Sequence, residues 1–91
     1  MADKRPDYVL FDQNTRAIVF GYQQAAIQRM LDFDYTCRRP TPSIACIVDV
    51  TQEGNHKCFW GTTEILIPIY RSVTEAVQNH PDADVLVNFA S

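Results

Sequence analysis

The sequence has few of the residues from which metal and redox motifs are built. Its three cysteines, Cys37, Cys46 and Cys58, are odd in number and show no C-x-x-C spacing, so neither a disulfide framework nor a zinc site is predicted. We interpret all three as reduced thiols. Cys46 lies in an apolar run, where a buried small hydrophobic residue is favoured over a nucleophile. No metal site is expected.

Basic clusters and long apolar stretches are also scarce. The net charge is −3 at pH 7, and no basic cluster is longer than a pair such as Arg38-Arg39, which argues against nucleic acid as a partner. The longest apolar run, 65–70, is interrupted by Pro68 and is far too short to span a membrane, and the sequence begins without an apolar signal core. We therefore expect no membrane contact and a cytoplasmic location.

What the sequence does contain is an alternation of short apolar runs and amphipathic segments. With 46% hydrophobic and 21% charged residues, the 91 residues have the composition of one small folded domain. The polar residues 1–9 are expected to form a flexible arm and residues 10–91 the domain. The runs 17–20 and 44–48 are typical of strands buried on both faces.

Two helices and a third strand complete the prediction. After Gly21, apolar residues spaced i, i+3 and i+4 indicate an amphipathic helix that fades near Tyr35. The capping box Ser-Val-Thr-Glu at 72–75 begins a second helix, which ends before Pro81, and a strand follows at 85–87. The order of elements predicts an α/β fold, the first β-α-β-α-β half of a Rossmann-like domain with a parallel sheet.

The segment 51–70 is expected to add no central strand. Residues 51–56 have turn composition, and 58–61 are predicted as a short extended piece. The run 65–70 is assigned to an extended connector or an edge element, because a proline cannot donate to a central ladder. A doubly wound sheet reverses beside its first strand. The chain is expected to stop before that crossing, which would leave an open edge on the strand at 17–20.

The junction at Gly21 is the main candidate for chemistry. Free amides at the start of the helix that follows would attract phosphate. The junction has one glycine and not G-x-G-x-x-G, so ordinary NAD binding is not predicted. From the pattern alone, a glycine that only makes room for packing stays open as an alternative.

The remaining polar and aromatic candidates receive structural interpretations. His80 is assigned to the apolar face of the second helix and His56 to a loop, and neither is interpreted as catalytic. Residues 59–60, Phe-Trp, are more typical of a core than of adenine stacking. Asp32 and Asp34, two residues apart on a helix, point to different faces and form neither an acid/base pair nor a metal site.

Several blocks of the sequence together point to a known family. The blocks are 10–21, 28–35, 59–61, 64–68 and 84–91, and the strings MLDFDY and NFAS within them are the most specific. Over nearly all of residues 10–91 the sequence resembles the ATP-citrate lyase family and, more distantly, the α subunit of succinyl-CoA synthetase. The resemblance implies the amino-terminal part of a CoA-binding Rossmann-like domain.

The family makes acetyl-CoA, oxaloacetate, ADP and phosphate from citrate, CoA and ATP, through a phosphohistidine. By matching positions, the resemblance implies that a loop at 21–26 cradles the phosphates of CoA, that 50–51 flank the adenosine, and that the last residue opens a further loop. The implied CoA-binding residues are Gly21, Tyr22, Gln23, Gln24, Ala25, Ala26, Val50, Thr51 and Ser91. ATP and Mg would bind outside this segment, on other domains or subunits of a homo- or hetero-oligomer.

No catalytic residue is assigned to the chain itself. The family's phosphorylated histidine lies in a Gly-His-Ala-Gly-like loop, and neither histidine here has that context. We therefore expect a fragment that contributes CoA binding and is inactive alone. Two alternatives stay open: a stand-alone CoA- or nucleotide-binding Rossmann module without catalysis, and a structural piece that pairs through an exposed first-strand edge.

Overall fold

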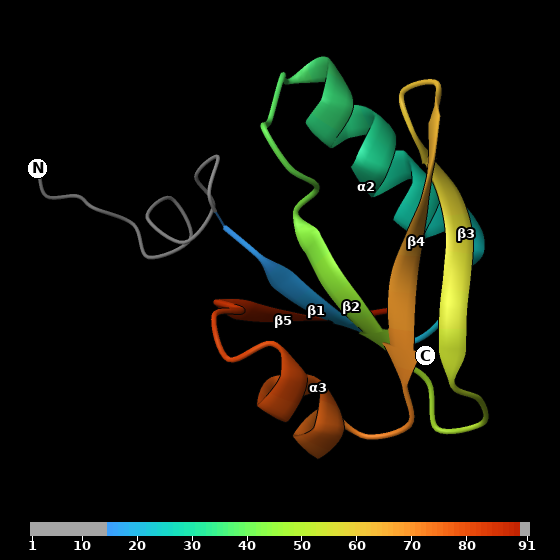
Figure 1. The fold of residues 1–91 in the computed structure, drawn as a ribbon, viewed down its shortest axis with the longest axis vertical. Coiled ribbons are helices and arrows are strands. Elements are labelled where there is room, and N and C mark those ends of the chain that lie inside the picture. The colour runs from blue at the N-terminus through green and yellow to red at the C-terminus, as the bar shows by residue number, and fades with distance from the viewer. Residues whose placement is uncertain (1–14, 90–91) are drawn as a thin grey trace, which may run out of the picture.

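The computed structural model describes residues 15–89, which form a five-stranded sheet in the order β3-β4-β2-β1-β5 with two helices (Figure 1). The expected arm at 1–9 and Ser91 lie outside the described residues. The elements are β1 (Ala17–Phe20), α2 (Gln24–Thr36), β2 (Ile44–Val48), β3 (Gly54–Trp60), β4 (Thr63–Tyr70), α3 (Val73–Asn79) and β5 (Val85–Asn88).

Four of the five strands form a parallel, doubly wound core. β1 pairs in parallel with β2 and with β5, and β2 pairs in parallel with β4. The chain thus moves outward from β1 through β2 to β4 and then returns through α3 to the other side of β1. The predicted α/β class with a parallel sheet is confirmed.

The position of β5 corrects the predicted extent of the fold. Ala17 pairs with Val85 and Phe20 with Asn88, so the chain already crosses to the far side of β1. The prediction that it stops before this crossing is wrong. β1 is hydrogen-bonded on both sides, and the proposed pairing through an open β1 edge has no surface to use. The outermost strands of the described sheet are β3 and β5.

The segment 54–70 holds two strands that the sequence did not reveal. β3 and β4 form an antiparallel hairpin, and β4 lies between β3 and β2, inside the sheet and not at its edge. Pro68 is tolerated there because the parallel pairing with β2 is confined to Ile69 and Tyr70, beyond the proline. The hairpin turns at Gly61, whose φ of 64° lies in the left-handed region that glycine adopts without strain.

The helices cover opposite faces of the sheet, so the central strands β1 and β2 are buried from both sides (Figure 1). Side chains alternate between the faces, and in β1 Val19 points towards α2 while Ile18 points towards α3. The core under α2 contains Val19, Ile27, Leu31, Ile44, Ile47, Cys58, Ile67 and Ile69. The smaller core under α3 contains Ile18, Cys46, Val48 and Ala76.

Local signals in the sequence are reproduced well. α2 and α3 lie where they were predicted, and the Ser72 hydroxyl accepts a hydrogen bond from the Glu75 amide at 3.1 Å, as a capping box requires. All three cysteines are free. Cys46 is fully buried, and burial raises the pKa of its thiol to about 11, as expected of a hydrophobic core residue and not of a nucleophile.

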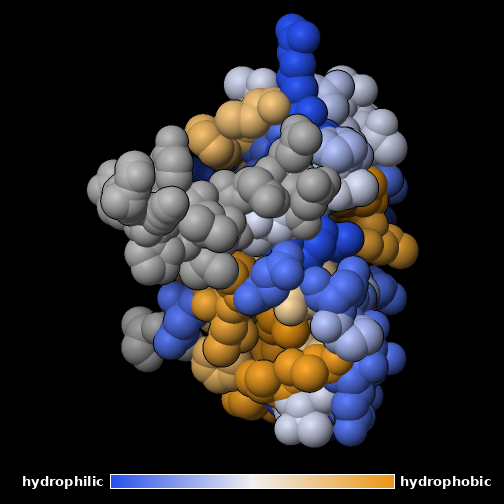
Figure 2. Space-filling view, turned by 90° about the vertical axis from the view of Figure 1, so that its left-hand side faces the viewer, coloured by the Kyte–Doolittle hydropathy of each residue, from blue (hydrophilic) through white to orange (hydrophobic). Residues whose placement is uncertain are grey.

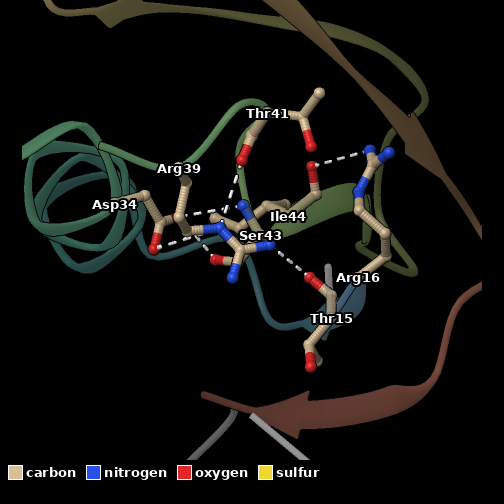
Figure 3. A network of polar contacts seen from close by, with 7 residues as sticks. All are labelled: Thr15, Arg16, Asp34, Arg39, Thr41, Ser43 and Ile44. Atoms are coloured by element: carbon tan, nitrogen blue, oxygen red, sulfur yellow. Dashed lines mark hydrogen bonds and ion pairs between the residues drawn. The ribbon is translucent and has the colours of Figure 1, made fainter. Parts of the chain in front are cut away.

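A polar network fixes the amino-terminal ends of β1 and β2 (Figure 3). Asp34, near the end of α2, is buried and accepts hydrogen bonds from the Ser43 amide at 2.8 Å and the Ser43 hydroxyl at 2.6 Å. Arg39 lies 3.9 Å from the same carboxylate and donates to the Thr15 carbonyl at 2.6 Å. Asp34 therefore has a structural role, and no group of three potential metal ligands occurs within residues 15–89.

The side of the molecule that carries β5 and α3 exposes apolar surface, which gathers in the lower half of the view from that side (Figure 2). Leu86 on β5 is 55% exposed, and Val73 and Val77 on α3 are also exposed. In the part of the chain that is described, no helix is long and apolar enough to cross a membrane.

Candidate functional site

The carboxyl ends of four parallel strands meet at one edge of the sheet. The residues that leave these strands continue the ladders: Gly21 N donates to Val48 O at 2.9 Å, Asp49 N to Tyr70 O at 2.8 Å, and Phe89 N to Phe20 O at 2.8 Å. The strand order reverses at β1, between β2 and β5. Ligands of doubly wound sheets bind outside the carboxyl ends at such a reversal, so this edge is the candidate site.

A tight turn at Gly21 joins β1 to α2. The φ of Gly21 is 108°, a backbone conformation that residues with a Cβ rarely adopt, which explains the glycine at this position. The Gln23 amide donates back to the Gly21 carbonyl at 3.1 Å, and α2 starts at the next residue. The turn therefore places the first turn of α2 at the carboxyl edge.

The amino terminus of α2 has no internal cap. The side chain of the N-cap residue Gln23 makes no capping hydrogen bond, and the first turn holds no acidic residue. Ile27 N is the first amide of the helix to bond a carbonyl, that of Gln23, at 2.9 Å. The amides of residues 24–26 thus have no acceptor within the described chain. Free amides and the helix dipole together attract an anion.

Tyr22, in the middle of the turn, contacts a histidine from the hairpin. Its hydroxyl lies 2.6 Å from Nδ1 of His56, and the two rings pack edge to face with centroids 5.0 Å apart. Burial lowers the pKa of His56 and is also the main cause that raises the pKa of Tyr22. His56 is a buried residue of β3, so its assignment to a loop is wrong.

The loop after β2 is ordered by a carboxylate that the sequence analysis missed. Asp49 accepts hydrogen bonds from the Thr51 amide at 2.9 Å, the Thr51 hydroxyl at 2.7 Å and Gln52 Nε2 at 3.1 Å. These bonds lower the pKa of the Asp49 carboxyl. An acidic residue directly after a buried strand was the signal available. Doubly wound folds often place a ligand-binding acid near this point.

Most of the predicted CoA-binding residues lie at this edge. Residues 21–26 form the turn and the first turn of α2, while Val50 and Thr51 project from the neighbouring loop and are exposed. The bond from Gly21 N to Val48 O holds the two loops side by side. Ser91 lies beyond the described residues, although β5 runs towards the same edge.

The other candidates lie elsewhere. His80 follows α3, where Nε2 lies 3.1 Å from the Tyr70 hydroxyl. Trp60 packs against Tyr35 with ring centroids 5.4 Å apart, in agreement with a core role. Phe59, in contrast, is 50% exposed, so its assignment to the core is wrong.

The fold and the carboxyl edge define a Rossmann-like α/β domain of the class that holds phosphate-bearing ligands at a turn between strand and helix. No protein-family model matches the chain. Individual proteins do match. The chain is 50% identical over 88 residues to ATP-citrate synthase subunit 1 of Sordaria macrospora, covering 94% of this chain and 13% of that protein. It is 49% identical over 83 residues to human ATP-citrate synthase, covering 90% of this chain and 8% of the human protein.

Solved structures agree with the sequence comparison. The ATP citrate lyase of Methanothrix soehngenii in complex with citrate and coenzyme A matches with a TM-score of 0.88 and 58% identity, over 92% of this chain and 14% of that one. A mutant of the Methanosaeta concilii ATP citrate lyase in complex with (3S)-citryl-CoA matches equally well. The resemblance to ATP-citrate lyase is therefore confirmed for a chain that spans 14% or less of these relatives.

Proposed function

We propose that this chain is the CoA-binding start of an ATP-citrate lyase, which makes acetyl-CoA and oxaloacetate from citrate, CoA and ATP. Sequence identities of about half and solved relatives that hold CoA or citryl-CoA support this proposal. ATP and Mg would bind to other domains or subunits of an oligomer. The acetyl-CoA would serve lipid biosynthesis in the cytoplasm, and residues 10–91 would be the first part of a larger domain.

The uncapped start of α2 is the observation that carries the proposal. The diphosphate of CoA is an anion, and the amides of residues 24–26 are donors without an acceptor in the described chain. Gly21 has no side chain to obstruct the approach of a phosphate to the turn. Val50 and Thr51, on the adjacent loop, would flank the adenosine. In this arrangement the backbone does most of the binding.

The described residues contain no free imidazole that could accept a phosphoryl group. Nδ1 of His56 faces the Tyr22 hydroxyl in a buried position, and Nε2 of His80 faces the Tyr70 hydroxyl. The chain would therefore bind and orient CoA, and the rest of the enzyme would perform the chemistry. A stand-alone binding module is not favoured, because the proteins that match are ATP-citrate synthases and lyases.

A ligand titration followed by thermal unfolding tests the proposal. A ligand that binds only the folded state raises the midpoint of unfolding. CoA should raise the midpoint of the purified chain in a concentration-dependent way, and NAD should not. Dephospho-CoA should act more weakly if the phosphate on the ribose is also bound. Equal responses to CoA and NAD, or no response to CoA, would contradict CoA binding by this chain.

A further inference from the structure

The β3–β4 hairpin is tied to the start of α2 by two contacts between residues far apart in sequence. The first joins the Tyr22 hydroxyl to Nδ1 of His56 at 2.6 Å. The second is reciprocal: Gln28 Nε2 donates to the Phe59 carbonyl at 2.9 Å, and Phe59 N donates to Gln28 Oε1 at 3.1 Å. Tyr22 precedes the uncapped amides of residues 24–26 and Gln28 follows them. The hairpin is therefore hydrogen-bonded to a residue before and a residue after the free amides of the proposed phosphate-binding turn.

The two contacts differ in how firmly they can hold. His56 is 7% exposed and the partly buried Tyr22 packs against the core under α2, so their bond is partly shielded from water. The bonds between Gln28 and Phe59 lie in exposed surroundings, where water competes for the same groups. The part-buried contact between Tyr22 and His56 is therefore the stronger constraint on the turn. His56 reaches the turn although β4 and β2 lie between β3 and β1 in the sheet.

We propose that His56 is a positioning residue for the CoA site: through Tyr22 it fixes the turn at 21–23 and thereby the direction of the free amides of α2. His56 itself does not touch the ligand. This inference rests on the proposed function, and it adds that the hairpin is part of the binding device as well as an extension of the sheet. Preorganised donors bind an anion better because less ordering is needed on binding.

Two substitutions remove the bond and leave most of the packing in place. Tyr22→Phe deletes one oxygen atom, and His56→Phe keeps an aromatic ring in the buried position. The matched control is His80→Phe, which breaks the other tyrosine–histidine contact, 3.1 Å long, at the far end of α3. All three variants lose one bond of the same kind. Only the first two lose it at the turn.

The rate of amide hydrogen exchange measures how firmly the turn is held, and this measurement needs no ligand. The bonded amides of Gly21, Gln23 and Ile27 report on it, since they donate to Val48, Gly21 and Gln23. Tyr22→Phe and His56→Phe should each speed exchange at these amides about five- to tenfold, as the loss of one hydrogen bond predicts, and weaken CoA binding by a similar factor. The double variant should be no worse than the single variants, because both remove the same interaction. His80→Phe should change neither quantity.

The outcomes separate this inference from the function on which it rests. Unchanged exchange at the three amides in Tyr22→Phe would overturn the inference, and so would equal acceleration in His80→Phe, which would indicate general loosening. If wild-type chain fails to bind CoA, the proposed function fails, while the exchange rates still decide whether His56 holds the turn. Should His56→Phe not fold, Tyr22→Phe alone completes the test.

Discussion

Burial makes His56 harder to protonate in the folded state than an exposed histidine. The folded state lowers the pKa of its imidazole below the ordinary value of 6.5, and the cause is desolvation. Below pH 6.5 the unfolded chain binds a proton there that the folded chain excludes. Stability at this site is therefore present above the ordinary pKa and is lost as the pH falls towards the lower folded pKa.

The free energy of unfolding should accordingly decrease as the pH falls through the ordinary pKa of 6.5 towards the lower folded pKa. His56→Phe should flatten this dependence, because the variant has no proton to gain at that position. Urea unfolding of the wild type and of His56→Phe at several pH values measures the effect. A slope that is identical in wild type and His56→Phe would contradict the account of a neutral, buried imidazole.

Asp34 is the residue on which the amino-terminal end of the sheet depends. Its buried carboxylate accepts two hydrogen bonds from Ser43 and faces Arg39. Asp34→Ala would remove the acceptor of both Ser43 donors and the carboxylate that faces Arg39, so we expect a loss of about 2–4 kcal/mol in the free energy of unfolding. Asp32→Ala, an exposed change on the same helix, should cost less than about 0.5 kcal/mol. Urea denaturation compares the two, and similar losses would refute the role assigned to Asp34.

Residues whose partners are close in sequence were predictable, and those with distant partners were not. Ser72 caps Glu75, three residues along, so the capping box could be recognised directly. His56 and Tyr22 are 34 positions apart, and no local sequence pattern predicts their contact. The exposure of Phe59 could not be predicted for the same reason, because it depends on the position of β3 at the outside of the sheet.

At the scale of elements, the type of each helix and strand was easier to infer than its neighbours. The runs in β1 and β2 are apolar because both faces are covered, a property that the sequence displays. β4 was not predicted as a central strand because of Pro68. A proline argues against a central strand unless its missing amide falls outside the ladder. The pairing of β5 with β1 is set by the topology of the chain, and no sequence pattern within β5 predicts it.

The turn between β1 and α2 contains a glycine whose backbone conformation disfavours any other residue. Gly21→Val places a β-branched side chain at a φ of 108°, which is strongly disfavoured, and crowds the approach to the amides of α2. CoA affinity measured by calorimetry should fall. Gly54→Val is the matched control: the φ of Gly54 is 135°, and a Cβ there meets no atom within 4 Å. Unchanged CoA affinity in a folded Gly21→Val variant would refute the placement of the phosphate.

At the scale of the whole molecule, the chain is a small part of the proteins it resembles. It covers 14% of the Methanothrix soehngenii structure, and the remaining length of that protein has no counterpart here. The site assigned to this chain is made largely of backbone amides and one glycine. This explains how binding residues can be inferred in a chain to which no catalytic side chain is assigned.

The central claim is that the amides at the start of α2 bind the phosphates of CoA. Gln24→Pro tests it most directly, because proline at the first position of a helix removes one amide donor and is otherwise well tolerated there. Gln23 before it is extended, as a residue preceding proline must be. Val73→Pro makes the same change at the first position of α3, after the extended Ser72.

The measurement is the dissociation constant of CoA for the wild type and the two proline variants, by isothermal titration calorimetry. Loss of one hydrogen bond to a charged group predicts binding about 10- to 100-fold weaker for Gln24→Pro, with Val73→Pro unchanged. Equal affinities for all three folded proteins, or no CoA binding by any of them, would contradict the claim.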